Sequence, residues 1–226
     1  MKKIIFALVS FVVVLVLSKN AESQLIIDDF DNGGITSQID AGVASSSTSD
    51  TNILGGQRIE SLEVPTLPMG GEFFGAVGFG NGNFVVTQGS LDQIRGGLQY
   101  NFLGGTDLTG GGTFRNFALD FTSLDSDDPL TDVLQLSVTS GGTTATHNVT
   151  IPDQNSATEI LVDLANFNNV DLTSVDSIEL GFDFSNNPGR DFQLGTFSVT
   201  SVPEPGSLAV LSIAVSAMLL RRRRNR

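Results

Sequence analysis

The segment Ile178-Glu-Leu-Gly-Phe-Asp-Phe184 decides the fold class, because apolar residues alternate along it with polar or small ones. Alternation with a period of two places every second side chain on the same face of a β-strand. The four apolar residues therefore form a buried face, and the three residues between them form a solvent face. We expect a strand with one side packed on a core.

The same alternation recurs on both sides of this segment, over residues 94–102, 117–121, 134–138 and 192–199. In the last of these the parity of the apolar residues changes after Leu194, and Gly195 at the switch predicts a β-bulge. Clusters rich in Gly, Asn, Asp and Ser separate the segments and predict turns. They occur at residues 31–34, 80–83, 110–112, 125–129, 140–142 and 186–189.

These patterns predict an all-β protein with about ten or eleven strands in an antiparallel, jelly-roll-like β-sandwich. No period of 20 to 50 residues repeats, which argues against a solenoid. Short helical turns are expected at residues 164–167 and 172–175. The Ser- and Thr-rich residues 41–52 predict a loop or a poorly ordered strand.

Residues 1–23 are predicted to be an export signal with a helical apolar part. Lys2 and Lys3 precede a fourteen-residue apolar run over 4–17, and small residues at positions 21 and 23 suit a signal peptidase. We expect cleavage between Ser23 and Gln24. An uncleaved membrane anchor is the alternative.

Residues 202–226 combine a rigid tripeptide, a short apolar helix and a block of cations. The apolar run 207–220 would make roughly 21 Å of helix, against a bilayer core about 30 Å thick. Arginines at its end can reach the interface, so the run predicts a short transmembrane helix. A buried amphipathic helix with a basic end is the alternative. The arginines that follow the run are expected to stay on the cytoplasmic side of the membrane, so the rest of the chain would lie on the other side. They are Arg221, Arg222, Arg223 and Arg224.

This order of Pro203-Glu204-Pro205, apolar helix and arginine cluster resembles the PEP-CTERM sorting signal of bacterial exported proteins. The resemblance implies processing by an exosortase, a membrane protease-transpeptidase, in a bacterium that produces exopolysaccharide. The two prolines hold the segment extended, as a protease requires. The protein would be anchored transiently in the inner membrane and would reach the cell envelope, the outer surface or the extracellular space.

Residues 24–201 form the predicted domain, and its charge limits the function classes. It holds four arginines, no lysine and twenty-three acids, which is a net charge of −19. Such a surface repels nucleic acid and anionic lipid. The chain has no cysteine, which excludes disulfides and thiol catalysis.

The order of short segments in this domain is similar to galactose-binding-like jelly rolls, a group that includes carbohydrate-binding modules. The segments are 27–31, 107–109, 134–138, 160–167, 171–180 and 191–194. In that fold a structural Ca²⁺ often joins the exit of the first strand to the last strand. The resemblance therefore implies an oxygen-ligated Ca²⁺ site, with Asp28, Asp29, Asp31 and Asp191 in the matching places. The alternative is that these aspartates form turns and solubilise the chain.

Catalytic chemistry has little support in this sequence. Without cysteine, lysine or a second histidine in the domain, no nucleophile–base set exists, and His147 is expected at the surface of a strand edge. Paired carboxylates could hydrolyse glycosides, but twenty-three acids make pairs by accident. There is no Trp for sugar stacking, so Tyr100, Arg95 and Arg115 are the residues to consider for sugar contacts, unless they are merely core-edge and surface residues.

We therefore expect an exported, non-catalytic surface or matrix protein associated with exopolysaccharide in a biofilm. Its expected partners are a signal peptidase, an exosortase and exopolysaccharide. The alternative is a carbohydrate-binding module of the galactose-binding type, with or without structural Ca²⁺. A glycan-active enzyme is the third possibility.

Overall fold

The computed structural model describes residues 23–31, 37–38, 42–64, 75–80, 82–88, 94–124, 130–152, 156–186 and 191–201. Gln24–Ser201 forms one compact unit. Its described residues contain thirteen strands and one 3₁₀ helix, η1 (Leu164–Phe167). The strands are β1 (Gln24–Asp28), β2 (Ser37–Gln38), β3 (Gly42–Ser49), β4 (Gln57–Val64), β5 (Gly75–Gly80), β6 (Asn83–Gln88), β7 (Arg95–Thr106), β8 (Asn116–Leu124), β9 (Leu130–Ser140), β10 (Thr143–Ile151), β11 (Thr158–Asp163), β12 (Val175–Asp183) and β13 (Phe192–Thr200).

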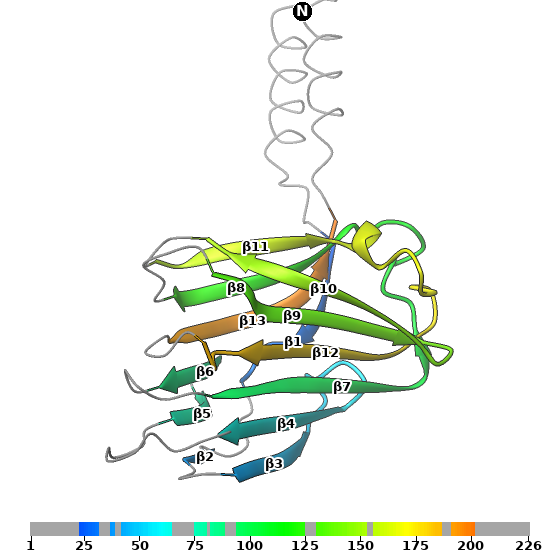
Figure 1. Ribbon diagram of the computed structural model, residues 1–226. Helices are drawn as coiled ribbons and strands as arrows, with labels where there is room; N and C mark the ends of the chain where they lie inside the picture. Colours follow the sequence, from blue (N-terminus) through cyan, green and yellow to red (C-terminus); the bar gives the residue numbers. More distant parts are fainter. Residues whose placement is uncertain are drawn as a thin grey trace, which may run out of the picture. The chain divides into compact units, whose positions relative to one another are not determined.

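The strands form two antiparallel sheets (Figure 1). One has seven strands in the order β11-β8-β13-β6-β5-β2, with β1 also paired to β13. The other has six strands in the order β10-β9-β12-β7-β4-β3. β6 and β1 pair with successive stretches of β13, over 192–194 and 197–200. The predicted all-β, antiparallel architecture is confirmed.

Side chains from both sheets form one hydrophobic core between them. The ring of Phe84 on β6 lies 6.2 Å from that of Phe182 on β12, and Tyr100 on β7 lies 5.9 Å from Phe197 on β13. Eleven phenylalanines are buried in the part of the chain that the structure describes. Every core residue that the structure describes belongs to Gln24–Ser201, so this unit has a core of its own and should fold by itself.

The segment 178–184 behaves as its alternation predicts, since its four apolar residues are all at most 3% exposed. The bulge at Gly195 is also confirmed, because the pairing of β13 with β8 shifts between Leu194 and Thr196. Gly96 on β7 has a packing role: a Cβ there would lie 2.2 Å from the Ser61 carbonyl oxygen and 2.8 Å from the Phe182 ring.

Three sequence predictions need correction. The strands are more numerous than expected, partly because most of residues 41–52 forms the ordered edge strand β3, paired with β4 along its whole length. Its inward hydroxyls have a buried acceptor: Ser46 and Thr48 donate to the carboxylate of Glu60. Residues 164–167 do form a helical turn, but 172–175 do not. There Asp171 accepts hydrogen bonds from the backbone and hydroxyl of Thr173, which makes a turn leading into β12.

A buried ion pair joins the two sheets. Arg58 on β4 donates to Asp28 at the end of β1, and the two side chains are 0% and 1% exposed. The Arg58 Nε also lies 3.0 Å from Glu60 Oε1, and the Tyr100 hydroxyl donates to Asp28 Oδ2 at 3.1 Å. Burial raises the pKa of Asp28, while the Arg58 charge opposes that rise. Burial also raises the pKa of Tyr100, which keeps its hydroxyl a donor.

Aromatic rings complete the surroundings of Arg58. Its guanidinium carbon lies 3.8 Å from the ring centroid of Phe79 on β5 and 5.6 Å from that of Phe30. Phe30 has a φ of 54°, a conformation that costs about 1–2 kcal/mol for an L-residue. Its backbone N–H donates to Asp28 Oδ1 at 2.9 Å, so the carboxylate that holds Arg58 also holds this turn.

The predicted signal helix, transmembrane helix 207–220 and the sorting motif lie outside the described residues. Within the part of the chain that the structure describes, no helix is both long and apolar enough to cross a bilayer.

Replacing Arg58 by alanine leaves the Asp28 carboxylate buried without its cation, so we expect the free energy of unfolding to fall by about 3–5 kcal/mol. Urea denaturation of Gln24–Ser201 measures this loss. Arg95→Ala is the matched control, because it removes the exposed Arg95–Glu63 pair and should change the unfolding free energy far less. Equal losses in the two variants would contradict a special role for the buried pair.

Candidate functional site

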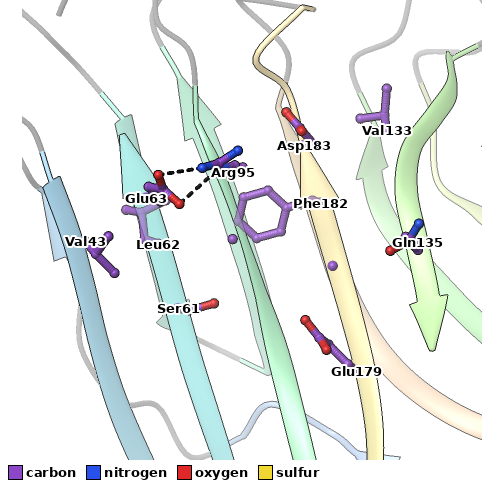
Figure 2. A pocket seen from close by; sticks show the side chains of 12 residues that line it. Val43, Ser61, Leu62, Glu63, Arg95, Val133, Gln135, Glu179, Phe182 and Asp183 are labelled. Atoms are coloured by element: carbon purple, nitrogen blue, oxygen red, sulfur yellow. Dashed lines mark hydrogen bonds and ion pairs between the residues drawn. The ribbon is translucent and has the colours of Figure 1, made fainter. Parts of the chain in front are cut away.

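The outer face of the six-stranded sheet carries a trough of about 370 Å³ (Figure 2). Strands β3, β4, β7, β9 and β12 all contribute to it. The lining residues are Val43, Ser61, Leu62, Glu63, Arg95, Gly96, Val133, Gln135, Glu179, Gly181, Phe182 and Asp183. A hollow of this size is in the range of ligand-binding clefts.

Strand register creates the trough, because it aligns small residues in neighbouring strands. Gly181 of β12 pairs with Gly97 of β7, and Gly97 pairs with Ser61 of β4. On the other side of β12, Gly181 pairs with Gln135 of β9. Gly181, Ser61 and Gln135 of this row line the trough, and the two glycines put no side chain into it.

Charged side chains surround the depression. Arg95 donates to both oxygens of Glu63, with Nη2–Oε1 at 2.7 Å and Nε–Oε2 at 2.9 Å. This hydrogen bond lowers the pKa of Glu63, which is a carboxylate at neutral pH. Asp183 pairs with Arg95 in the register of β12 and β7, and Glu179 lies farther along β12 (Figure 2). The trough thus has three carboxylates and one guanidinium.

The chemistry of the trough is that of hydrogen bonding. Carboxylates accept, the guanidinium and the Gln135 amide donate, and charged groups form the stronger bonds. Among the described residues that line the trough, the only aromatic one is Phe182, which is 3% exposed and belongs to the core. For this described lining, ligand binding would depend on hydrogen bonds to ligand hydroxyls and on shape, without a stacking platform.

The structure separates the three residues that the sequence suggested for sugar contacts. Arg95 lies in the trough. Tyr100 is fully buried against Asp28, so its ring is closed to ligands and the suggestion was wrong. Arg115 is exposed and lines a second hollow of about 320 Å³ beside η1, together with Asp163 and Asp171.

Sequence reasoning missed Glu63, Gln135, Glu179 and Asp183. The alternation in 178–184 already places residues 179, 181 and 183 on the solvent face. Nothing in the sequence indicated that β7 and β9 flank this strand or that β4 follows β7, and only that arrangement gathers the four residues.

His147 lies on the edge strand β10, as expected for it, and is half-buried. Its Nε2 is 3.5 Å from Asn166 Nδ2, and its ring meets Phe167 edge-on with centroids 6.2 Å apart. The histidine packs on η1 and lies outside both hollows.

Many aspartates shape turns. In the described residues, seven accept a hydrogen bond from the backbone N–H two positions later: Asp28, Asp29, Asp50, Asp107, Asp163, Asp171 and Asp183. The Thr109 hydroxyl lowers the pKa of Asp107, and the Thr173 hydroxyl lowers that of Asp171. For Asp28 and Asp29, turn formation is the alternative that the sequence left open beside a Ca²⁺ site.

No protein-family model matches the sequence, and no curated protein matches it either. Among solved structures, the chain is similar to a family 11 carbohydrate-binding module from Clostridium thermocellum in complex with a β-1,3-1,4-mixed-linked tetrasaccharide. The TM-score is 0.41 and the identity 15%, over 82% of this chain and 99% of that one. It is also similar to a mutant family 29 carbohydrate-binding module complexed with mannohexaose, with a TM-score of 0.35 and 10% identity over 79% and 92% of the two chains.

A third similar structure is an exo-β-agarase, with a TM-score of 0.41 and 13% identity over 79% of this chain and 25% of that one. These likenesses are distant, so the ligand class has to be inferred from the residues of this chain.

Three of the aspartates predicted to hold Ca²⁺ make other contacts through their side chains. The Asp28 carboxylate is occupied by Arg58, Asp31 N–H donates to Asp29 Oδ1 at 3.2 Å, and Asp191 Oδ1 accepts from Gln88 N–H at 2.9 Å. The described residues contain no group of three or more acidic, histidine or cysteine side chains that could hold a metal.

The calcium site at Asp29, Asp31 and Asp191 remains a prediction from the sequence, and a thermal melt tests it. A bound structural ion stabilises the folded state by mass action, so excess EGTA should lower the melting temperature and added Ca²⁺ should restore it. Asp29→Asn should abolish the response. A melting temperature that changes with neither EGTA nor Ca²⁺ would contradict the calcium prediction.

Proposed function

We propose that the protein is an exported, non-catalytic surface or matrix protein whose β-sandwich binds a polysaccharide in the trough of the six-stranded sheet. The observation that carries the proposal is the row Gln135–Gly181–Gly97–Ser61, bordered by the Glu63–Arg95 pair, Glu179 and Asp183. An open trough across several strands suits an extended chain, and its polar side chains suit sugar hydroxyls.

The charge of the trough favours a neutral glycan. Glu63, Glu179 and Asp183 outnumber Arg95, and the unit as a whole has a net charge of −19. A uronic or sulfated polysaccharide would meet like charge in this trough and around it. Neutral sugar hydroxyls can donate to the carboxylates and accept from Arg95 without that repulsion.

A role in binding, without catalysis, is supported by the residues around the trough. The chain has one histidine and no cysteine, and His147 lies outside the trough. Arg95 and Glu63 are engaged with one another, an arrangement that positions hydrogen-bonding groups.

Delivery by the PEP-CTERM route is part of the proposal. The last strand, β13, ends at Thr200, three residues before Pro203. An exosortase would then cut the Pro203-Glu204-Pro205 region close to the folded sandwich and remove the arginines at 221–224. The released unit would be an acidic glycan-binding protein at the envelope or in the extracellular matrix.

Filling the trough should abolish glycan binding. A Cβ at Gly181 meets nothing nearer than 3.8 Å, so Gly181→Val fits the folded strand while its side chain occupies the floor. On an array of neutral and uronic polysaccharides, we expect wild type to bind neutral glycans and Gly181→Val to bind at least about tenfold more weakly, a loss of about 1.4 kcal/mol.

Two further variants sharpen this experiment. Arg95→Ala removes a charged donor and should weaken binding roughly tenfold or more. Ser123→Val is the matched control, because it enlarges an exposed residue on β8 of the other sheet. The glycan proposal fails if wild type binds no glycan with Ca²⁺ or with EGTA, or if Gly181→Val binds as wild type does.

Mass spectrometry of the mature protein from its producing bacterium tests the delivery route. We expect an N-terminus at Gln24 and a C-terminus within or before residues 203–205. Replacing Pro203 and Pro205 with alanine should leave the C-terminal segment attached. Mature protein that retains Arg226 would overturn the sorting proposal without affecting the glycan proposal.

A further inference from the structure

The two edge strands of the six-stranded sheet, β3 and β10, are free of charged residues and proline. β3 reads Gly-Val-Ala-Ser-Ser-Ser-Thr-Ser, and β10 reads Thr-Thr-Ala-Thr-His-Asn-Val-Thr-Ile. Figure 1 shows where the two strands lie in the fold. Soluble proteins usually protect such edges with charges, proline or very short strands, because an open edge pairs with other chains. In a unit with a net charge of −19, two uncharged edges are notable.

The seven-stranded sheet has the usual protection. Its edge strand β11 carries Glu159 near its start and Asp163 at its end. At the other end of its strand order, β2 is two residues long, while the five-residue β1 lies off this order and pairs only with β13 in the described residues. The same chain thus protects the two end strands of one sheet and leaves those of the other sheet neutral.

We propose that β3 of one copy pairs with β10 of the next, so that the six-stranded sheet continues from copy to copy. Successive strands in this sheet are antiparallel and six in number, so β3 and β10 run in opposite directions. A copy added head-to-tail therefore places β10 antiparallel to β3, which continues the alternation. Head-to-tail contacts that do not close into a ring make filaments, and sheet twist makes such a filament helical.

We call the contact between β3 of one copy and β10 of the next the seam. The register of the sheet defines which residues would meet there. Ser45, Ser61, Gly97, Gly181, Gln135 and Asn148 form one row across the six strands. An unstaggered seam therefore sets Ser45 beside Asn148. It also sets Ser47 beside Thr146 and Ser49 beside Thr144, all on the outer face.

Hydroxyl pairs of this kind already hold β10 to β9. The hydroxyls of Ser137 and Thr146 are 3.0 Å apart, and those of Thr139 and Thr144 are 2.8 Å apart. Cross-strand Thr and Ser pairs stabilise antiparallel sheets. The proposed seam would repeat this ladder with the serines of β3.

Charge repulsion between two copies is weak at the seam, although the surface as a whole is acidic. Both acids of β4, the strand beside β3, have cationic partners: Glu60 pairs with Arg58 and Glu63 pairs with Arg95. The remaining repulsion between copies acts over longer distances, and salt screens it with a Debye length of about 8 Å at 0.15 M. Association should therefore strengthen as salt rises.

The partner at this surface is a second copy of the chain, because the two edges match each other in direction, length and neutrality. β3 has eight residues and β10 has nine. The inference does not depend on glycan binding. If both hold, the trough row would continue across the seam from Ser45 to Asn148 of the next copy.

Sedimentation velocity of Gln24–Ser201 at low and high NaCl tests the seam. Wild type should form a series of oligomers that lengthen with protein concentration and with salt. Ser47→Lys and Thr146→Glu should each lower the association constant about tenfold or more. Each places an unpaired charge on a strand edge that loses its water when two copies pair. Ser123→Lys and Ser123→Glu are matched controls on an exposed position away from both edges.

The decisive measurement is sedimentation velocity of a mixture of the Ser47→Lys and Thr146→Glu variants. In a β3–β10 seam the introduced lysine and glutamate face one another, and the other seams are wild type, so the mixture should recover long oligomers. Melting temperatures equal to wild type establish that both variants are folded. Monomeric wild type at every salt concentration, undiminished association of either variant, or a mixture that stays short would each overturn the proposal.

Discussion

The buried pair of Arg58 and Asp28 is the interaction on which the sandwich depends. It joins β4 of one sheet to the end of β1 in the other, in a core that is mostly apolar. Moving two charges out of water is expensive, and the surroundings offset that expense with hydrogen bonds from Tyr100 and Phe30 and with the ring of Phe79. The pair therefore ties one point of the six-stranded sheet to one point of the seven-stranded sheet.

Scarcity of cations gives this pair its importance. Residues 24–201 contain four arginines and twenty-three acids, and one of the four arginines, Arg58, is buried in the core. Arg95, another of them, stands in the trough, where it orders Glu63 and leaves the site with an excess of carboxylates. The acids that remain keep copies apart over most of the surface, which makes the neutral strands β3 and β10 the places where contact meets least repulsion.

Much of the fold follows from local patterns. Alternation identified the core faces of the strands around 94–102, 117–121, 134–138 and 178–184, and Gly195 marked the bulge in β13. The prediction failed at β3, where serines and threonines lack an apolar face. Their hydroxyls fit inside only because Glu60, held by Arg58, lies on the neighbouring strand. Arg58 itself gave no signal, since an arginine in an alternating segment is ordinarily a surface residue.

For the strands with apolar alternation, the sequence alone determined which side faces the core, because the two-residue period is a local property of the chain. It also determined the acidity of the unit, the absence of cysteine and aromatic sugar platforms, and the resemblance of residues 202–226 to a sorting signal. Tertiary structure alone decided which strands are neighbours and in what register. That register aligns Gly97 with Gly181 into a trough and leaves two neutral strands at the edges of one sheet, and it depends on contacts between residues far apart in the chain, which no local pattern encodes.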